Sequence, residues 1–239
     1  MKKVTIIIPV FNEENFIRET INAVNAINLK QIGLEKDLVI VDDCSDDDTG
    51  KILDEMKSVY PHLKVLRHLK NKGKGAAVQT GVKASNGDVI LIQDADMEYD
   101  PSEYPKLLSP LIDGKADVVF GSRFAGGEAH RVLYFWHYVG NKFLTLLSNM
   151  LTDLNLTDME SCYKVFKAEI FNQIQVKENG FGFEPEITAK VAKLAKAGKC
   201  KIYEVGISYS GRTYSEGKKI NWKDGLSALR CILKYNLVG

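Results

Sequence analysis

Three acidic residues follow an apolar segment near the middle of the sequence. Residues 89–92 read Val-Ile-Leu-Ile, and Asp94, Asp96 and Glu98 come shortly after them. Side chains two residues apart share one face of an extended chain, so these carboxylates are predicted to converge on one point if the strand geometry persists. Oxygen ligands suit a hard cation, and Mg²⁺ or Mn²⁺ held against a nucleoside diphosphate is the sharpest interpretation.

The alternative interpretation is that these acids only cap the next helix. Asp100, Pro101 and Glu103 already have the residue types expected at the N-cap, the first helical position and the third helical position. The three upstream carboxylates are therefore not needed for capping, and this favours the metal site.

Two further apolar segments predict strands that also end in polar residues. Residues 4–8 precede Pro9 and lead through Glu13 into an amphipathic helix, and residues 38–41 precede Asp42. Continuous apolar strands separated by helices indicate an α/β fold with a mostly parallel sheet and helices on both faces. Ligands of such sheets bind at the carboxyl ends of the strands, so the three polar segments are predicted to meet in one pocket.

Other segments carry weaker signals. The loop at residues 71–77 contains glycines that allow close backbone approach to a ligand and lysines that suit phosphate, although plain turns have the same composition. Residues 117–123 predict a strand that ends at Arg123, which is either a phosphate ligand or a surface residue. A basic loop at residues 210–219 either closes over an anion or is simply solvated.

An aromatic-rich segment at residues 131–151 is compatible with a helix. Such a helix is about 30 Å long, which is enough to span a bilayer, but it contains too many polar residues to do so. Two interpretations stay open, a core helix and an interfacial helix that lies in a membrane surface.

The composition excludes several classes of protein. The 239 residues carry a formal net charge of +1, which gives no argument for nucleic-acid binding. The four cysteines have no C-x-x-C spacing, so a disulfide or metal framework is not expected and a reducing compartment fits best. No signal peptide or transmembrane helix is predicted, and we expect a cytoplasmic protein.

Six motifs occur in an order that is typical of one family. They are residues 6–14, 41–45, 71–77, 93–96, 121–124 and 211–213. Together they resemble the family 2 inverting glycosyltransferases of GT-A fold, and most of all the polyprenyl-phosphate (dolichyl-phosphate) mannose and glucose synthases. The resemblance covers nearly the whole chain. It implies one GT-A domain, with a nucleotide-sugar-binding half at about 1–123 and a smaller acceptor-binding half at about 124–239.

The resemblance implies a donor site. Asp94 and Asp96 match the family's Asp-x-Asp, whose carboxylates hold the Mg²⁺ or Mn²⁺ that bridges the diphosphate. Glu98, the third expected metal ligand, stands where mannose synthases commonly have Gln. The residues that match nucleotide-binding positions are Pro9, Phe11, Glu13, Asp42, Lys72, Gly73, Asp94, Ala95 and Asp96.

The resemblance also implies an acceptor site. Arg123, Arg131 and Arg212 resemble the arginines that clamp the acceptor phosphate and the donor, with Lys218 as a helper. A polyprenyl phosphate is already an anion, so arginines that orient it suffice and no strong base is required. We therefore expect transfer of a hexose from a GDP-mannose or UDP-glucose type of donor to a polyprenyl phosphate, on the cytosolic face of a membrane that residues 132–151 contact.

Three alternatives stay open. A sugar-hydroxyl acceptor would need a carboxylate to take its proton, and Asp158 lies where the resemblance implies that base, with Glu160 as second choice. A non-catalytic sugar-nucleotide-binding module would not need the acceptor-side arginines. A nucleotidyltransferase would carry a glycine-rich, basic first loop, whereas residues 9–14 are neither glycine-rich nor basic.

Overall fold

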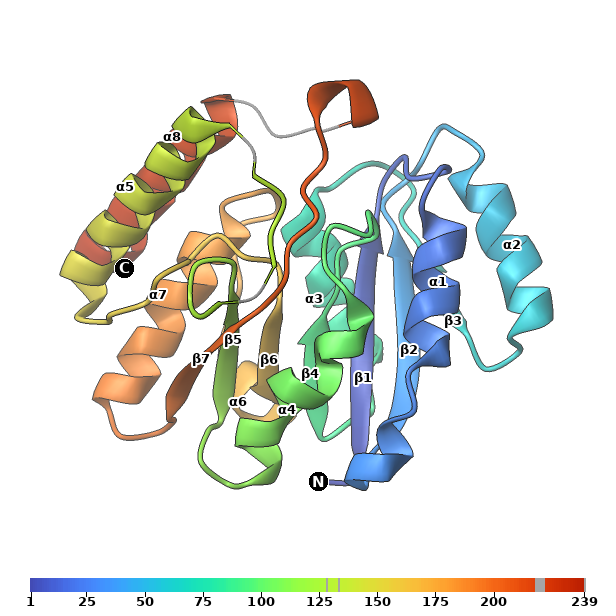
Figure 1. Ribbon diagram of the computed structural model, residues 1–239, viewed down its shortest axis with the longest axis horizontal. Coiled ribbons are helices and arrows are strands. Elements are labelled where there is room, and N and C mark those ends of the chain that lie inside the picture. The colour runs from blue at the N-terminus through green and yellow to red at the C-terminus, as the bar shows by residue number, and fades with distance from the viewer. Residues whose placement is uncertain (128, 133, 218–221, 239) are drawn as a thin grey trace.

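A mixed seven-stranded sheet forms the centre of the computed structural model, which describes residues 1–127, 129–132, 134–217 and 222–238 (Figure 1). The strand order is β3-β2-β1-β4-β6-β5-β7. The strands are β1 (Lys3–Val10), β2 (Glu35–Asp42), β3 (Lys64–Arg67), β4 (Val89–Ile92), β5 (Val118–Ser122), β6 (Lys164–Lys167) and β7 (Ile202–Gly206).

Parallel pairing dominates this sheet, as the sequence predicts. β1 lies between β2 and β4 and is parallel to both, β3 is parallel to β2, and β7 is parallel to β5. β6 is the exception, because it inserts antiparallel between β4 and β5. The sequence analysis did not identify β6, a four-residue strand in which two lysines flank Val165 and Phe166.

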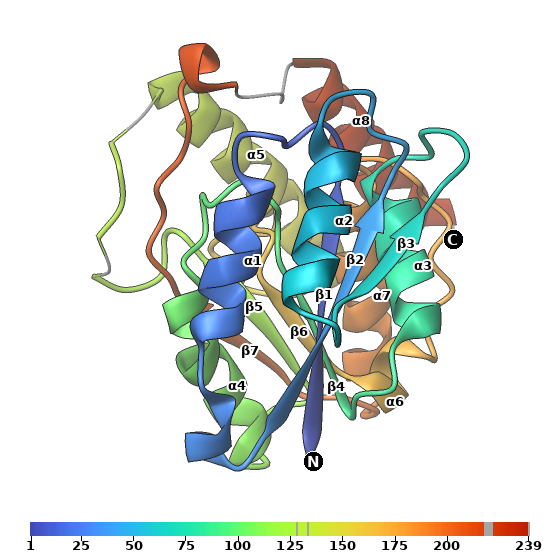
Figure 2. The same ribbon diagram turned by 90° about the vertical axis from the view of Figure 1, so that its right-hand side faces the viewer.

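Helices cover both faces of the sheet (Figures 1 and 2). In Figure 2, α1 and α4 lie on one side of the strands, and α3 and α7 on the other. α5 and α8 pack against each other and against α7. The α-helices are α1 (Ile17–Ala26), α2 (Thr49–Val59), α3 (Lys74–Ala84), α4 (Tyr104–Ile112), α5 (Phe135–Thr152), α6 (Ala168–Phe171), α7 (Phe183–Lys196) and α8 (Trp222–Leu233).

Short helical turns complete the described chain. The 3₁₀ turns are η1 (Leu29–Ile32), η2 (Pro101–Glu103) and η3 (Tyr214–Glu216), and a π-helical turn, Lys234–Val238, follows α8. The predicted cap before residue 101 is confirmed, since the Asp100 side chain accepts a hydrogen bond from the Ser102 N–H at 2.8 Å. The Glu103 carboxylate instead accepts from the backbone N–H of Ser208.

The aromatic-rich segment forms α5, but its apolar side chains are not in the core. The buried positions of this helix are the small polar residues Thr145, Ser148 and Thr152. The core-helix interpretation is therefore wrong for the apolar residues, most of which point to the exterior. None of the helices in the described ranges combines the length and apolarity needed to cross a membrane.

Two helical glycines differ in the space around them, and this gives a test of the packing. A Cβ at Gly81 in α3 would lie 2.5 Å from Ile7 Cγ2 of β1, whereas a Cβ at Gly140 in α5 would have no neighbour within 4 Å. We expect Gly81→Ala to lower the free energy of unfolding by about 1–3 kcal/mol, because the packed helix must shift away from the sheet.

Gly140→Ala is the matched control, and we expect it to raise the free energy of unfolding by up to about 1 kcal/mol through helix propensity alone. Urea denaturation of both variants measures the two changes. Equal effects of the two substitutions would contradict the close approach of α3 to β1.

Candidate active site

A cavity of about 1810 Å³ lies at the carboxyl ends of β1, β4 and β5. It exceeds the roughly 300–1,000 Å³ of common small-molecule pockets, so it has room for a nucleotide sugar together with an acceptor. The sequence-predicted site residues that line it come from both halves of the chain: Pro9, Phe11, Glu13, Gly73, Asp94, Ala95, Asp96, Glu98, Arg123, Arg131 and Arg212. Asp42, Lys72 and Asp158 are not among its lining residues, and Lys218 lies outside the described residues.

The acidic segment does not keep the strand geometry on which its prediction rested. β4 ends at Ile92, and Met97 has a left-handed backbone with a φ of 58°. The expected convergence of Asp94, Asp96 and Glu98 on one point is therefore wrong. Across the part of the chain that the structure describes, no group of three His, Cys, Asp or Glu side chains is placed to hold a metal ion.

The Arg212 guanidinium joins these acids instead. Its Nη2 lies 2.8 Å from Asp96 Oδ2, its Nη1 lies 3.1 Å from Glu13 Oε2, and its Nε lies 3.4 Å from Glu98 Oε1. The backbone N–H of Arg212 also donates to Glu98 Oε1 at 2.8 Å. One cation from the end of the chain thus partly neutralises three carboxylates from its first hundred residues.

Negative charge at this edge exceeds what one arginine can neutralise. Burial, followed by the charges of Asp94 and Glu98, raises the pKa of Asp96 to about 7, although Arg212 opposes the shift. Such a set of oxygens fits Mg²⁺ or Mn²⁺, because a hard divalent cation would relieve the repulsion between the carboxylates. Asp94 and Asp96 both line the cavity and are the residues that would hold the ion.

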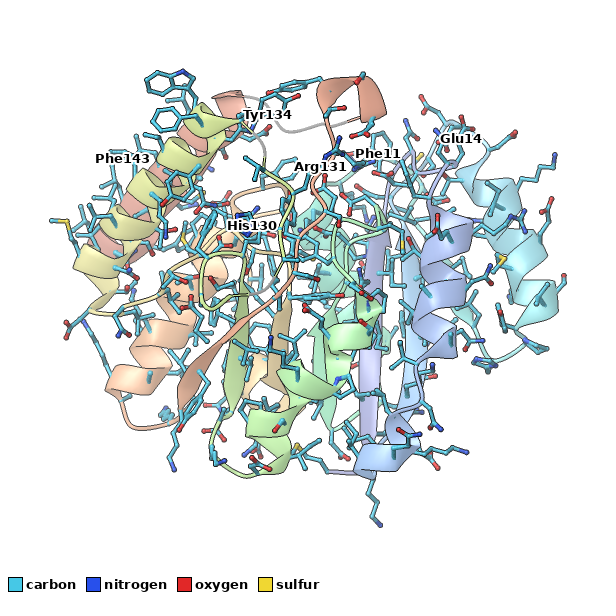
Figure 3. All side chains as sticks on the ribbon, viewed as in Figure 1. Phe11, Glu14, His130, Arg131, Tyr134 and Phe143 are labelled. Carbon is cyan, nitrogen blue, oxygen red and sulfur yellow. The ribbon has the colours of Figure 1, made fainter. Side chains whose placement is uncertain are left out.

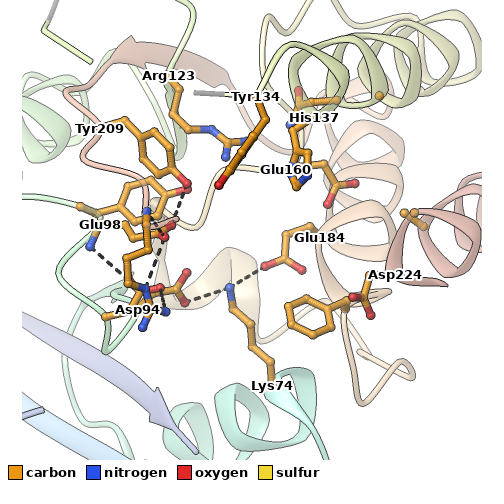
Figure 4. Close-up of a pocket in the computed structure, with 18 of the residues that line it drawn as sticks. Lys74, Asp94, Glu98, Arg123, Tyr134, His137, Glu160, Glu184, Tyr209 and Asp224 are labelled. Atoms are coloured by element: carbon orange, nitrogen blue, oxygen red, sulfur yellow. Dashed lines mark hydrogen bonds and ion pairs between the residues drawn. The ribbon is translucent and has the colours of Figure 1, made fainter. Parts of the chain in front are cut away.

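Lys74 is a site residue that the sequence analysis did not single out. Its Nζ lies 2.9 Å from Asp94 Oδ1 and 2.9 Å from Glu184 Oε1, as the dashed lines of Figure 4 show. Burial opposes the charge, yet Asp94 and Glu184 hold the pKa of Lys74 well above its usual value. The signal for Lys74 was present in the loop at 71–77, but its carboxylate partners come from distant segments.

The glycines of that loop serve packing within the protein. A Cβ at Gly73 would lie 2.5 Å from Asn179 O, and one at Gly75 would lie 2.3 Å from Glu178 O. The backbone at these two glycines therefore lies close to residues 178–180 of the protein. The sequence had suggested close approach to a ligand, with a plain turn as the alternative. Gly73 nevertheless lines the cavity as predicted.

Asp42 and Asp43 have different surroundings. The Asp42 carboxylate is buried and accepts hydrogen bonds from the Ser45 N–H and hydroxyl. The Asp43 carboxylate accepts from the backbone N–H groups of Lys72 and Gly73, and Asp43 lines the cavity. Asp43 thus holds the start of the 71–77 loop in place, while the nucleotide-binding role of Asp42 stays a prediction.

Asp158 is fully buried beneath Arg123. Arg123 Nε donates to Asp158 Oδ2 at 2.6 Å, and Arg123 Nη2 donates to Oδ1 at 2.8 Å. Burial favours protonation, but the charge and hydrogen bonds of Arg123 keep the pKa of Asp158 below its usual value. A carboxylate held in this way is poorly placed to take a proton from an acceptor hydroxyl.

Glu160, the second choice for that base, lines the cavity. Burial and the neighbouring charge of Glu184 raise the pKa of Glu160 to about 8, so this carboxyl group is mostly protonated at pH 7. Glu184, in the first turn of α7, also lines the cavity, and the sequence did not predict it as a site residue.

Two loops of the second half meet at the cavity mouth. Arg131 Nη1 lies 2.7 Å from Glu216 Oε2 and donates to Gly211 O at 3.1 Å. The ring Nε2 of His137 lies 2.8 Å from the Tyr214 hydroxyl. These contacts connect the segment before α5 and the first turn of α5 to the loop around η3. Arg131 lines the same cavity as Arg123.

The family model described as glycosyl transferase family 2 matches residues 5–175, which include the acidic segment and β6. This chain belongs to glycosyltransferase family 2. The match covers well over half of the sequence, from within β1 to beyond β6. The chain is therefore a glycosyltransferase, as the motifs predicted.

Two curated relatives are similar to this glycosyltransferase over most of its length. A dolichol-phosphate mannosyltransferase of Pyrococcus furiosus is 30% identical over 219 residues, covering 90% of this chain and 59% of that protein. An undecaprenyl-phosphate mannosyltransferase of Micrococcus luteus is 30% identical over 228 residues, covering 90% of this chain and 87% of that protein. The chain thus spans just under three fifths of the Pyrococcus relative.

Solved structures confirm the predicted GT-A fold. Glucosyl-3-phosphoglycerate synthase from Mycobacterium tuberculosis, in complex with Mn²⁺, UDP and phosphoglyceric acid, superposes with a TM-score of 0.73 at 19% sequence identity. The superposition covers 100% of this chain and 80% of that one.

Gln93 anchors the acidic segment of this glycosyltransferase, residues 94–98, to the end of β4. Its Oε1 accepts hydrogen bonds from the hydroxyls of Tyr104 and Tyr163, both at 2.7 Å. Its Nε2 donates to Asp94 O at 2.9 Å. A buried, fully bonded amide at the end of β4 thus fixes where the segment that carries Asp94 and Asp96 leaves the sheet.

The raised pKa of Asp96 predicts a pH-dependent stability. Its folded-state pKa of about 7 lies above the ordinary aspartate value of 3.8, so stability is lost as the pH rises between these two values. In EDTA at pH 8, we expect Asp96→Asn to have a free energy of unfolding about 1–3 kcal/mol higher than wild type, with the difference shrinking towards pH 5.

Urea denaturation at several pH values measures this difference. Asp113→Asn, which removes an exposed carboxylate near the end of α4, is the control and should show no comparable gain at pH 8. A loss of stability in Asp96→Asn at pH 8 would contradict the charge repulsion at the acidic edge.

Proposed function

We propose that this glycosyltransferase transfers a hexose from a nucleoside-diphosphate sugar to a polyprenyl phosphate, with inversion at the anomeric carbon and with a divalent metal ion. The observation that carries the proposal is the composition of one cavity. Asp94 and Asp96 line one part of it, and Arg123 and Arg131, from the second half of the chain, line another. A cation-binding edge and an anion-binding edge in one cavity suit a diphosphate donor and a phosphate acceptor.

The names of the relatives support a lipid phosphate acceptor. Relatives named for dolichol phosphate and undecaprenyl phosphate are 30% identical to this chain. A UDP-N-acetylglucosamine–dolichyl-phosphate N-acetylglucosaminyltransferase of Methanococcus voltae is 27% identical over 235 residues. The acceptor class is common to these names while the sugar differs, so we propose the acceptor class and keep both GDP-mannose and UDP-glucose as candidate donors.

The donor side would stabilise the leaving group. A divalent metal held by Asp94 and Asp96 would neutralise the charge that develops on the diphosphate as the glycosidic bond breaks. Pro9, Phe11 and Gly73 would contact the nucleotide, as the family motifs imply. Attack by the acceptor from the face opposite the diphosphate then gives inversion.

The acceptor side favours a phosphate over a hydroxyl. A phosphate oxygen is already anionic, so the protein has to orient it and does not have to deprotonate it. Asp158 is buried and bound by Arg123, and Glu160 is mostly protonated at pH 7, so neither side chain is suited to act as a base at that pH. Arg123 and Arg131 would hold the phosphate, and Lys218 remains a proposed helper.

The exterior of α5 supports contact with a membrane surface. Phe135, Trp136, Phe143 and Met150 are 67%, 77%, 57% and 73% exposed. Trp136, Phe143 and Met150 follow one another at intervals of seven residues, which places them on one face of the helix, and Phe135 adjoins Trp136. Figure 3 shows Phe143 on the outer side of α5, with Tyr134 beside the cavity mouth at the start of the helix. An interfacial α5 would bring the mouth of the cavity to the lipid whose headgroup is the acceptor, on the cytosolic face.

The transfer reaction is directly testable. We incubate the protein with GDP-mannose, UDP-glucose or UDP-N-acetylglucosamine, Mn²⁺ and undecaprenyl or dolichyl phosphate in detergent micelles, and measure the glycolipid formed. We expect one donor to give product and EDTA or Asp96→Ala to reduce the rate at least about 100-fold, because the leaving diphosphate loses its counter-charge. Transfer to free sugars at equal or higher rates would contradict a phosphate acceptor.

The membrane contact predicts a separate phenotype. The double substitution Phe135→Ser, Trp136→Ser should lower binding to anionic liposomes about tenfold or more, because two large exposed apolar side chains are lost. Val59→Ser, which removes an equally exposed apolar side chain at the end of α2, should bind like wild type. Liposome flotation measures both, and equal binding of all three proteins would count against an interfacial α5.

A further inference from the structure

Two carboxyl oxygens at the cavity wall have no hydrogen-bond partner among the described residues. They are Glu184 Oε2 and Glu160 Oε1, and both atoms are enclosed by protein. Glu184 is only 4% exposed, and both residues line the cavity. Leaving a buried polar atom without a partner is unfavourable, so an arrangement that leaves two of them at one cavity points to a ligand that satisfies them.

The two side chains lie next to each other at the cavity wall, and the Glu184 carboxylate is directed towards Lys74 (Figure 4). Lys74 Nζ contacts both Asp94 Oδ1 and Glu184 Oε1 at 2.9 Å, so a single nitrogen atom connects the acidic edge to Glu184. In a nucleoside-diphosphate sugar, the sugar is the group bonded directly to the diphosphate. A donor whose diphosphate lies at Asp94 therefore has its sugar close to Glu184 and Glu160.

The hydrogen-bonding capacity of the pair matches a hydroxyl ligand. Burial and the charge of Glu184 raise the pKa of Glu160 to about 8, so at pH 7 this carboxyl group is mostly protonated and can donate. Glu184 lies in the first turn of α7, and its Oε1 is held by Lys74 Nζ, which leaves Oε2 to accept. A sugar hydroxyl both donates and accepts.

We infer that Glu160 and Glu184 form a hydroxyl-binding pair that recognises the hexose of the donor. Glu184 Oε2 accepts a hydrogen bond from one hydroxyl of the sugar, and Glu160 bonds to the same or the adjacent hydroxyl. This inference rests on the proposed function, since it takes a nucleotide sugar as the ligand. Because a sugar that lacks the hydroxyl leaves Glu184 Oε2 and Glu160 Oε1 without partners, the pair discriminates against such a sugar.

Other roles of this pair fit the structure less well. A cation held by the pair would lie close to the positive charge of Lys74, whose Nζ already contacts Glu184 Oε1 at 2.9 Å. A purely structural ion pair with Lys74 explains Glu184 Oε1 but leaves Glu184 Oε2 and Glu160 Oε1 without partners. A ligand with hydroxyl groups accounts for both oxygens.

Calorimetric titration with two ligands tests the inference. For each protein we measure, with Mn²⁺ present, the affinity for the nucleotide sugar (GDP-mannose, UDP-glucose or UDP-N-acetylglucosamine) and for the matching diphosphate (GDP or UDP). The ratio of the two affinities isolates the sugar contacts. We expect Glu160→Leu and Glu184→Gln each to lower this ratio about tenfold, which corresponds to about one lost hydrogen bond.

Two variants serve as controls. Glu160→Gln keeps a donor and an acceptor of similar shape, and we expect it to retain the wild-type ratio within about threefold, which a purely apolar or steric role would not require. Glu169→Gln changes an exposed glutamate in the first turn of α6 and should leave both affinities unchanged. An equal fall of the affinity ratio in Glu160→Gln and Glu160→Leu would overturn the hydroxyl-binding pair. An unchanged ratio in both Glu160→Leu and Glu184→Gln would overturn it as well.

Deoxy donors give a second readout that does not depend on the folding of any variant. Wild-type protein should bind at least one monodeoxy form of its nucleotide sugar about tenfold more weakly, and Glu160→Leu or Glu184→Gln should show no further loss with that same donor. Additive losses would contradict the pairing. If the wild-type protein binds GDP or UDP and the variants behave like wild type, only this inference fails. If the wild-type protein binds neither GDP nor UDP nor any of the three nucleotide sugars, the proposed function fails as well.

Discussion

Repulsion among carboxylates at one edge of the sheet is the constraint on which the rest of the site depends. Parallel strands bring Glu13 and Asp96 to the same edge, and burial makes their charges costly. Arg212 offsets part of this cost by contacting both of them together with Glu98. A donor site of this charge is stable only because the second half of the chain supplies a cation, and the remaining negative charge is what a divalent ion would neutralise.

The same principle connects the other parts of the cavity. Lys74 at the start of α3 joins Asp94 to Glu184 of α7, and Arg123 after β5 holds Asp158 in a buried ion pair. These pairs connect segments that are far apart in the sequence. The charged groups of the site therefore also connect residues of the first 123 positions to residues that follow them. Phosphate groups that enter the cavity would compete with carboxylates for these cations. The ion pair with Asp158 holds the Arg123 guanidinium in one orientation before any ligand arrives.

The fold follows from local patterns where the patterns are long. Apolar strands that alternate with helices predicted a parallel sheet, and the order of β1, β2 and β4 confirms it. β6 escaped prediction because a four-residue segment that begins and ends with lysine carries no period that distinguishes a strand from a loop. Pairing with its two neighbours in the sheet makes it a strand. The α5 helix was predicted by its composition, but whether its aromatic face turns inward depends on which helices pack against it.

The sequence by itself determined the family, the acidic and basic motifs, and the sheet edge at which they meet, because strand direction and residue type are local properties. Only the tertiary structure decided which charge each carboxylate faces. Arg212 lies 116 residues from Asp96, and no local rule pairs them. Burial of Asp158 under Arg123, and the open oxygens of Glu160 and Glu184, depend equally on distant packing. A carboxylate's pKa and role are set by its surroundings, and these exist only in the folded chain.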